Sequence, residues 1–226
     1  MKHLLTRRTV LAAAVAALAC AAVPLIGRSQ GRTQSSAPAK GAGSAEFRSV
    51  EPPQPVETGN KIEVLEFFWY GCPHCYSFMP ELEAWRAKLP SDVEYRRLPV
   101  AFDASRMPHT KIFYALEQLK RLDLHEKVFS AIHVSKRNLL KDNEIADLMA
   151  ANGIDRAQWL SVFNSFSVVT KASRSNQVWA AYRVDGTPMV AVDGKYLTAP
   201  SMVGSTGGSI AVLDKLVQRA RAERKK

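Results

Sequence analysis

The stretch EFFWYGCPHCYSF, residues 66–78, places two cysteines three positions apart directly after an apolar, aromatic run. The run itself, residues 61–70, is rich in β-branched and aromatic side chains and ends at Gly71, which is typical of a buried strand. Beyond the cysteines, apolar side chains recur at helical spacing as far as Pro90. The sequence therefore predicts a strand that leads into a C-x-x-C motif at the first turn of a helix.

The first turn of a helix leaves backbone N–H groups without intrahelical partners, and these groups favour an anion. A Cys72 thiol beside them ionises more readily, and the thiolate is the reactive species in disulfide exchange. Pro73 suits the first turn because it sacrifices no backbone hydrogen bond there. His74 adds a second positive influence if its ring faces Cys72, and is otherwise a spacer that faces solvent. We therefore interpret Cys72 and Cys75 as a pair whose bond is made and broken during function.

Two other uses of the pair, a permanent crosslink and a metal site, fit the sequence less well. A disulfide stabilises most when it closes a long loop, and this loop holds only two residues between the cysteines. A structural zinc site needs four Cys or His ligands, of which one C-x-x-C motif supplies two. His109, His125 and His133 lack the spacing of zinc ligands, so we expect them at the surface or in helix caps and predict no metal site.

The chain has 226 residues, of which 46% are hydrophobic and 23% charged, enough for one sizeable core or two small ones. Its formal charge of +10 gathers at the ends, with +6 on residues 1–50 and +5 on residues 215–226. The middle, residues 51–214, carries −1. The charge therefore does not predict a nucleic-acid partner.

Residues 1–26 have the layout of an export signal, with basic residues followed by an apolar run over residues 10–26. The A-x-A pattern at residues 17–19 supplies a cleavage site just before Cys20. The alternatives are an uncleaved membrane anchor, for which about 17 apolar residues is near the lower limit, a lipoprotein at Cys20, and a twin-arginine signal. All of these lead out of the cytoplasm into an oxidising compartment.

Four segments follow the export signal. Residues 27–54 are rich in Ser, Gly, Pro, Gln and Thr, and we expect a flexible tether. Residues 55–102 predict strand, helix and strand, and residues 184–226 predict two strands and a helix. Between them, residues 103–183 show only helical patterns, over 108–121, 123–134, 142–151, 155–165 and 168–183. Because about 80 residues are too many for a loop, the pattern predicts an α/β fold with an inserted all-helical subdomain.

Local signals refine these boundaries. Asp142 and Asp155 are expected N-caps, and the Asn-Gly pair at 152–153 is expected to stop a helix. The Asp-Gly pair at 193–194 predicts the turn of a hairpin between the last two strands.

The segment VLEFFWYGCPHCYSF, residues 64–78, resembles the active-site segment of the DsbA family of periplasmic thiol-disulfide oxidoreductases. The resemblance extends over about residues 55–226 and includes VDGTPMVAVDGKY at 184–196. It implies a thioredoxin-like central sheet with an inserted helical subdomain, in a monomer.

The resemblance also implies roles for the cysteines and for a loop before the hairpin. Cys72 would be the exposed cysteine of low pKa that forms a mixed disulfide with substrate, and Cys75 its buried partner. The Thr187–Pro188 peptide bond would be cis and face the disulfide, and the Thr187 backbone would pair with an extended substrate chain. The alternative is an ordinary trans proline that opens a strand.

A third implied role concerns a carboxylate in the strand before the cysteines. Glu66 corresponds to a buried acid of the family, with a raised pKa and a part in carrying protons to or from Cys75. Its alternative is a surface glutamate on an edge strand. Arg97 is a candidate neighbour.

The resemblance implies an exported enzyme that donates its Cys72–Cys75 disulfide to reduced, folding proteins in the periplasm. It needs no cofactor besides that disulfide, and a membrane partner similar to DsbB would restore it. The alternatives are a reductase or isomerase on the same scaffold, a non-catalytic peptide-binding chaperone, and a glutaredoxin, which the export signal disfavours. The sequence departs from the best-known member at Gly71, where that member has an aromatic residue, at Thr187, where it has Val, and in its long tether.

Overall fold

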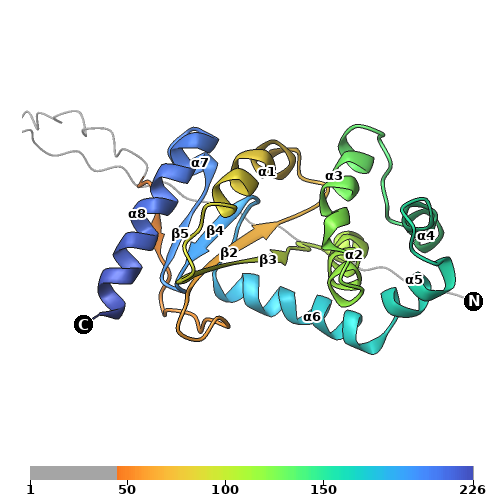
Figure 1. The fold of residues 1–226 in the computed structure, drawn as a ribbon, viewed down its shortest axis with the longest axis horizontal. Helices are drawn as coiled ribbons and strands as arrows, with labels where there is room; N and C mark the ends of the chain where they lie inside the picture. The colour runs from red at the N-terminus through yellow and green to blue at the C-terminus, as the bar shows by residue number, and fades with distance from the viewer. Residues whose placement is uncertain (1–44, 226) are drawn as a thin grey trace, which may run out of the picture. The chain divides into compact units, whose positions relative to one another are not determined.

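The computed structural model describes residues 45–225 (Figure 1). The predicted export signal and the tether before residue 45 lie outside the described residues. Within residues 45–225, no helix has both the length and the apolar character needed to cross a membrane.

The described chain contains five strands, eight α-helices and two short 3₁₀ helices. In chain order they are β1 (Arg48–Ser49), β2 (Ile62–Phe68), α1 (Pro73–Arg86), β3 (Val93–Pro99), η1 (Ala104–Arg106), α2 (Met107–Gln118), η2 (Leu122–Leu124), α3 (His125–His133), α4 (Asp142–Ala150), α5 (Arg156–Phe163), α6 (Phe166–Ala181), β4 (Met189–Val192), β5 (Tyr196–Thr198), α7 (Pro200–Val203) and α8 (Thr206–Arg224).

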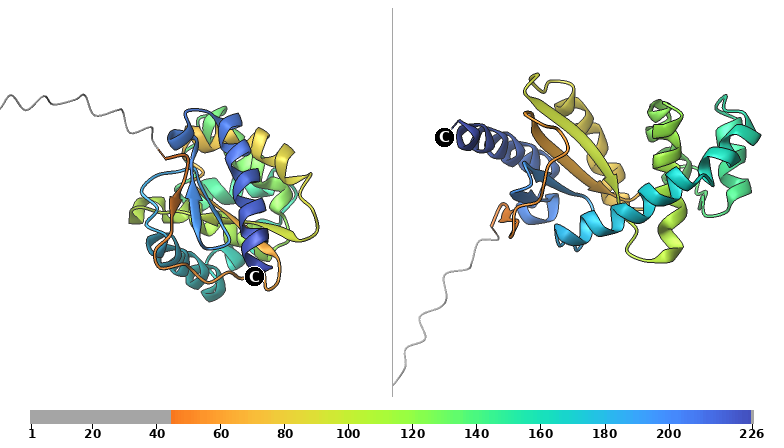
Figure 2. Two further views of the ribbon diagram at one scale, coloured as in Figure 1. Left: turned by 90° about the vertical axis from the view of Figure 1, so that its left-hand side faces the viewer. Right: turned by 90° about the horizontal axis from the view of Figure 1, so that it is seen from below.

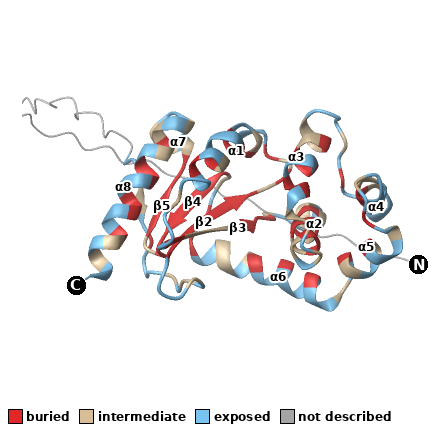
Figure 3. Cartoon of the chain, viewed as in Figure 1, coloured by how far each residue is buried: buried red, intermediate tan, exposed pale blue. Residues whose placement is uncertain are grey.

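The five strands form one mixed sheet in the order β1-β5-β4-β2-β3. Strands β2 and β3 are parallel and joined through α1, whereas β2–β4, β4–β5 and β1–β5 are antiparallel. All seven residues of β2 are buried (Figure 3). This strand lies in the interior of the sheet because it lacks the polar alternation that would let one face meet water.

The two faces of the sheet bury alternate residues of β2, as the pleat requires. On one face, Ile62 and Val64 pack in a cluster with side chains of α1 and α8. On the other, Leu65 and Phe67 pack in a second cluster, against which Trp179 of α6 lies. Figures 1 and 2 accordingly show α1 and α8 on one side of the sheet and α6 on the other.

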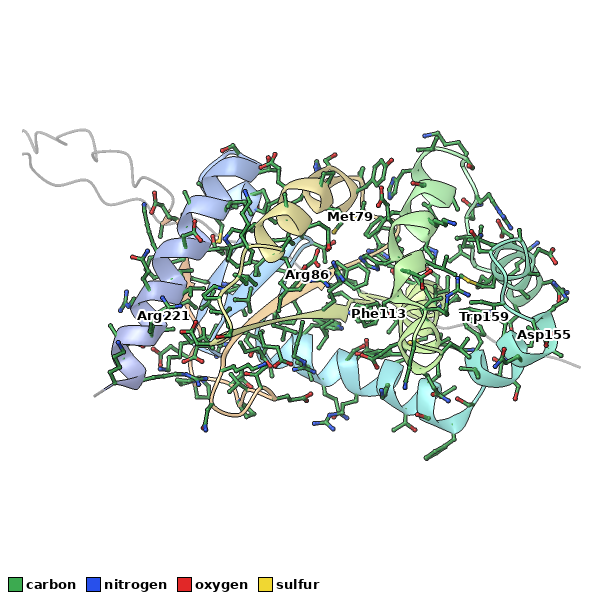
Figure 4. The ribbon with its side chains drawn as sticks, in the orientation of Figure 1. Met79, Arg86, Phe113, Asp155, Trp159 and Arg221 are labelled. Carbon is green, nitrogen blue, oxygen red and sulfur yellow. The ribbon has the colours of Figure 1, made fainter. Side chains whose placement is uncertain are left out.

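A third cluster joins the end of β2 to the helical subdomain. It begins with Phe68 and Tyr70, includes both cysteines of the C-x-x-C motif, and continues into α2, α3, α4 and α5. Figure 4 places Phe113 of α2 toward the sheet and Trp159 of α5 within the far helices. The motif therefore lies where the sheet and the helical subdomain meet.

The predicted helices of the insertion all form, with small shifts at their ends. Asp155 is the expected N-cap of α5 and accepts a hydrogen bond from the Gln158 N–H. The prediction for Asp142 was wrong: it is the first helical residue of α4, and Lys141 holds the N-cap position without a side-chain hydrogen bond. The residue at which a helix begins is uncertain by one or two positions in a sequence pattern, and here the helix begins one residue earlier than expected.

The predicted hairpin turn at 193–194 is also present, with φ values of 55° at Asp193 and 67° at Gly194. A side chain at Gly194 would meet the Gln54 carbonyl oxygen at 2.0 Å. The Gln54 N–H donates to the Gly194 carbonyl at 2.9 Å, and the Val50 N–H donates to Lys195 at 2.8 Å. The chain before residue 55 therefore packs against the hairpin.

This packing corrects the predicted tether, which was expected to extend to residue 54. Arg48 and Ser49 form β1 and pair with Leu197 and Tyr196 of β5. A two-residue strand has no periodicity, so composition alone assigned it to the tether.

Candidate active site

The active-site turn begins where β2 ends at Phe68. The Cys72 N–H donates to the Trp69 carbonyl at 2.9 Å, which closes a turn over residues 69–72. Cys72 is the extended N-cap residue of α1, and Pro73 is the first helical residue. The structure thus has the predicted order of strand, turn and helix, with the first cysteine at the helix N-terminus.

The two cysteines are free thiols in the structure. The pKa of Cys72 is lowered to about 5, and the largest cause is a hydrogen bond from the Cys75 thiol. Burial opposes this shift. Hydrogen bonds from the Thr187 side chain and from the backbone N–H groups of Cys75 and His74 lower the pKa further. The pKa of Cys75 is raised, first by burial and then by its interaction with Cys72. One thiol is therefore poised to ionise while the other keeps its proton.

Cys72 is less open to solvent than the resemblance implied, with 6% of its surface exposed against 1% for Cys75. It belongs to the buried cluster at the junction, and the loop before β4 covers it. The cause is a tertiary contact: the Cys72 thiol lies 3.2 Å from the Thr187 carbonyl oxygen and donates to it.

The loop that makes this contact contains the predicted cis bond, between Thr187 and Pro188. Beside it lies a pocket of about 400 Å³, lined by residues of α1, this loop and the segment from α7 to α8. His74 and Ser77 lie on one side of the pocket, and Gly186 and Pro188 lie on another. The pocket joins the predicted substrate-binding residues to the N-terminus of α1.

The exposed side chain of His74 lies in this pocket. Its backbone N–H contributes to the low pKa of Cys72. The structure therefore gives His74 a position next to the cysteine and at the edge of the pocket.

Glu66 lies in β2, an interior strand of the sheet, and is 5% exposed, so it is not a surface residue of an edge strand. Burial raises its pKa, against the opposing effects of Arg97 and Tyr95. The Arg97 guanidinium lies 3.3 Å from the Glu66 carboxylate, and the Tyr95 hydroxyl donates to the same oxygen. Glu66 in turn raises the pKa of Cys75 electrostatically. The structure thus agrees with the implied burial, the raised pKa and the neighbour Arg97.

A cavity of about 370 Å³ is lined by Arg97, the partner of Glu66, and by residues of α1 and α3. Its lining includes Glu83 and Arg86 of α1, Arg97 of β3 and His125 of α3. Arg97 also forms an ion pair with Glu83. In Figure 4, Met79, another lining residue, lies between α1 and α3.

The expectation that the histidines lie at the surface or in helix caps was wrong for His109, whereas His125 holds the C-cap position of η2 although it is buried. His109 and His125 are buried, at 3% and 5% exposure, and only His133 is partly exposed. His125 Nδ1 lies 2.8 Å from the Tyr70 hydroxyl, and His133 Nε2 lies 2.8 Å from the Tyr70 carbonyl oxygen. The ring of each histidine packs against an aromatic residue of the third cluster. Among residues 45–225, no group of three His, Cys, Asp or Glu side chains is placed to hold a metal ion.

The sequence reasoning gave no role to Trp69, which covers Gly71. A side chain at Gly71 would meet the Trp69 ring at 2.3 Å. The Arg106 guanidinium lies over the same ring, 4.2 Å from its centre, and makes a cation–π contact. The glycine directly before the C-x-x-C motif could have indicated this contact, because only a residue without a side chain leaves room for the Trp69 ring.

A mixed sheet with helices on both faces, a C-x-x-C pair at a helix N-terminus and a cis-proline loop against its first sulfur define a dithiol protein of the thioredoxin fold, here with a helical insertion. The profile of the DSBA-like thioredoxin domain family matches residues 63–208. The chain belongs to this family.

Relatives with similar sequences support this assignment. The chain is 42% identical over 180 residues to the thiol:disulfide interchange protein DsbA of Bordetella parapertussis, covering 79% of this chain and 86% of that protein. It is 41% identical over 201 residues to the protein of the same name from Burkholderia cepacia, covering 87% and 93%. The crystal structure of Pseudomonas aeruginosa DsbA superposes with a TM-score of 0.77 at 38% identity, covering 80% of this chain and 95% of that one. These findings confirm the resemblance drawn from the sequence.

Proposed function

We propose that this chain is an exported thiol-disulfide oxidoreductase that donates its Cys72–Cys75 disulfide to reduced, folding proteins. Membership of the family and the shared name of its relatives support thiol-disulfide exchange as the reaction. The observation that carries the direction of the reaction is the contrast between a Cys72 pKa of about 5 and a raised Cys75 pKa.

The reaction has two exchange steps. A substrate thiolate attacks the Cys72 sulfur of the oxidised enzyme, the Cys72–Cys75 bond breaks, and Cys75 leaves and takes up a proton. A second substrate thiolate then attacks the substrate sulfur of the mixed disulfide and expels Cys72 as a thiolate. The substrate loses two electrons and gains a disulfide, and the enzyme becomes the dithiol.

The low pKa of Cys72 drives the second step, because a stable thiolate is a good leaving group. Lowering the pKa from about 8.5 to about 5 stabilises the thiolate relative to the thiol by roughly 5 kcal/mol, of which about 3 kcal/mol is expressed at neutral pH. This stabilisation exists only in the reduced enzyme, since the oxidised enzyme has no ionisable thiol at Cys72. It therefore makes the disulfide a strong oxidant.

Glu66 serves the first step in this proposal. Cys75 leaves as a thiolate, yet its raised pKa means that it must be protonated near neutral pH. Glu66 is buried, interacts electrostatically with Cys75 and has a raised pKa of its own, so it is suited to supply and recover that proton.

Thr187 and Pro188 hold the substrate chain in this proposal. The Thr187 carbonyl accepts a hydrogen bond from the Cys72 thiol in the dithiol form. Once that sulfur has lost its proton or formed a disulfide, the carbonyl is free to accept an N–H from an extended substrate. The pocket beside Pro188 and His74 then receives a neighbouring substrate side chain.

The reduced enzyme must pass two electrons to an acceptor before it acts again. We assign this role to a membrane partner similar to DsbB, and the periplasm as the compartment, with residues 1–26 as the export signal. In this proposal the enzyme is a monomer. It uses no metal and no cofactor besides its disulfide, and it binds no nucleic acid.

One assay separates this proposal from its alternatives. The dithiol–disulfide equilibrium is measured against glutathione, beside the refolding of reduced ribonuclease. We expect an oxidised enzyme that restores ribonuclease activity stoichiometrically. A potential as reducing as that of thioredoxin would indicate a reductase, and protection of clients without any oxidation would indicate a chaperone.

A further inference from the structure

Helix α3 makes two polar contacts with Tyr70 of the active-site turn. The Tyr70 side chain is fully buried two positions before Cys72. Its hydroxyl lies 2.8 Å from Nδ1 of His125, and its backbone carbonyl oxygen lies 2.8 Å from Nε2 of His133. These histidines are the first and last residues of α3. One helix of the insertion therefore holds Tyr70 at both of its polar ends.

The proton arrangement of both bonds follows from their chemistry. Burial raises the pKa of Tyr70, so its hydroxyl keeps its proton. Burial lowers the pKa of His125 far below its usual value, so its ring is neutral. In the tautomer with its proton on Nε2, His125 accepts a hydrogen bond from the Tyr70 hydroxyl at Nδ1. The Tyr70 carbonyl can only accept, so His133 donates from Nε2 whether its ring is neutral or charged.

His133 also contacts the chain on the other side of Cys72. Its ring stacks on Tyr76 of α1, with centroids 4.9 Å apart and planes at 9°. The Tyr76 N–H donates to the Cys72 carbonyl at 3.2 Å. Figure 1 shows α1 and α3 as neighbours at this end of the sheet. His133 thus links the turn before Cys72 to the helix after it.

The turn needs such support because of Gly71. A glycine leaves the peptide unit between Tyr70 and Gly71 free to rotate, since no side chain restricts its backbone. That unit carries the carbonyl oxygen that His133 binds. The same turn delivers Cys72 to the helix N-terminus through the bond from its N–H to the Trp69 carbonyl.

We propose that His133 and His125 are positioning residues, which hold Tyr70 so that the Cys72 sulfur stays at the N-terminus of α1. The inference rests on the proposed role of Cys72. Without the two histidines the turn samples other arrangements, in which the sulfur lies farther from the N–H groups of His74 and Cys75. The thiolate is then less stable and the disulfide less oxidising.

The experiment compares two variants that each remove one bond. His133→Phe keeps an aromatic ring for the stack on Tyr76 and removes the N–H, whereas Tyr70→Phe keeps the buried ring and removes the hydroxyl. The acid dissociation constant of Cys72 is measured from thiolate absorbance near 240 nm, and the dithiol–disulfide equilibrium against glutathione. We expect each variant to lower the acid dissociation constant of Cys72 by about threefold to tenfold, the effect of one hydrogen bond. We expect the equilibrium constant for oxidation of glutathione by the enzyme disulfide to fall by the same factor. His133→Gln, whose amide N–H can replace the lost donor, should recover most of the loss.

Trp159→Phe is the matched control, because Trp159 is fully buried in α5 and packs on Phe163, in the far part of the insertion. It should lower the unfolding temperature and leave both constants unchanged. If His133→Phe and Tyr70→Phe behave as this control does, the histidines are merely structural and the inference is wrong. If Cys72 of the unaltered protein ionises as free cysteine does, the proposed function itself fails, whatever the variants show.

Discussion

Cys72 and Cys75 occupy one turn of helix, yet their surroundings differ in almost every respect that governs a thiol. Cys72 lies at the helix N-terminus, beside backbone N–H groups and the Thr187 loop. Cys75 faces the interior, where Glu66 and burial both disfavour its thiolate. The comparison shows that three residues of sequence separation are enough to give one sulfur the role of leaving group and the other that of proton-bearing partner.

The largest expected effect comes from removing the reactive sulfur. Cys72→Ser should lower disulfide donation by at least about a thousandfold, because serine forms no mixed disulfide. The measurement is oxidative refolding of reduced ribonuclease, with circular dichroism to verify the fold. Cys75→Ser is the matched control: given a substrate disulfide, its Cys72 thiolate should attack one sulfur and release the other as a thiolate. The mixed disulfide should then accumulate, because no second enzyme thiol is present to break it.

A chaperone would behave differently in the same experiment. If Cys72→Ser protected clients as well as the unaltered protein did, and the unaltered protein donated no disulfide, the two cysteines would have no separate roles to compare.

A second prediction uses the pH dependence of stability. The pKa of Cys72 is depressed in the folded, reduced protein, so its stabilising contribution is complete above about pH 8.5 and is lost as the pH falls to about 5. The oxidised protein lacks this group. We therefore expect the free energy of unfolding of the reduced form, relative to the oxidised form, to fall by about 4 kcal/mol from pH 8.5 to pH 5.

Urea unfolding of both redox forms at several pH values provides this measurement. A difference between the two forms that stayed constant across this range would contradict the assignment of a stabilised thiolate to Cys72.

A third prediction concerns the turn that delivers Cys72. Gly71→Ala should lower the free energy of unfolding by about 2 kcal/mol, because its Cβ would overlap the Trp69 ring at 2.3 Å. Gly186→Ala is the control, since a Cβ there meets nothing within 4 Å. Thermal unfolding of both variants gives the comparison, and equal losses would show that the Trp69 contact is not the cause.

The smallest expected effect tests the Cys75 side. The pKa of Glu66 is raised in the folded protein, so its contribution is complete at low pH, where it is protonated, and is lost as the pH rises from about 4.3 through the raised value. Glu66→Gln cannot ionise. The free energy of unfolding of the unaltered protein minus that of the variant should thus fall between pH 4 and pH 8. A difference that rises with pH would mean that Arg97 outweighs burial at this site.

The sequence predicted the elements that short-range patterns specify. The strand before the cysteines, the helix after them, the cap at Asp155 and the turn at 193–194 follow from periodicity and from residues with restricted backbone preferences. The contact between Cys72 and the Thr187–Pro188 loop followed from the family resemblance, because it joins residues 115 positions apart.

What the sequence did not predict depends on long-range packing. The β1 strand exists only because Arg48 and Ser49 meet β5, about 150 residues later. Arg97 was named only as a candidate neighbour of Glu66, because the register of β2 and β3 that pairs the two residues is specified by neither strand alone. His125 is buried because α3 packs on Tyr70, and a histidine in a helix carries no sign of which face will be covered.

The most direct test of the account is a titration of the Cys72 thiolate in the reduced protein, followed by absorbance near 240 nm, with Cys72→Ser to subtract other groups. The account predicts a midpoint at a pH of about 5. A midpoint near 8.5, the value of an ordinary cysteine, would contradict it.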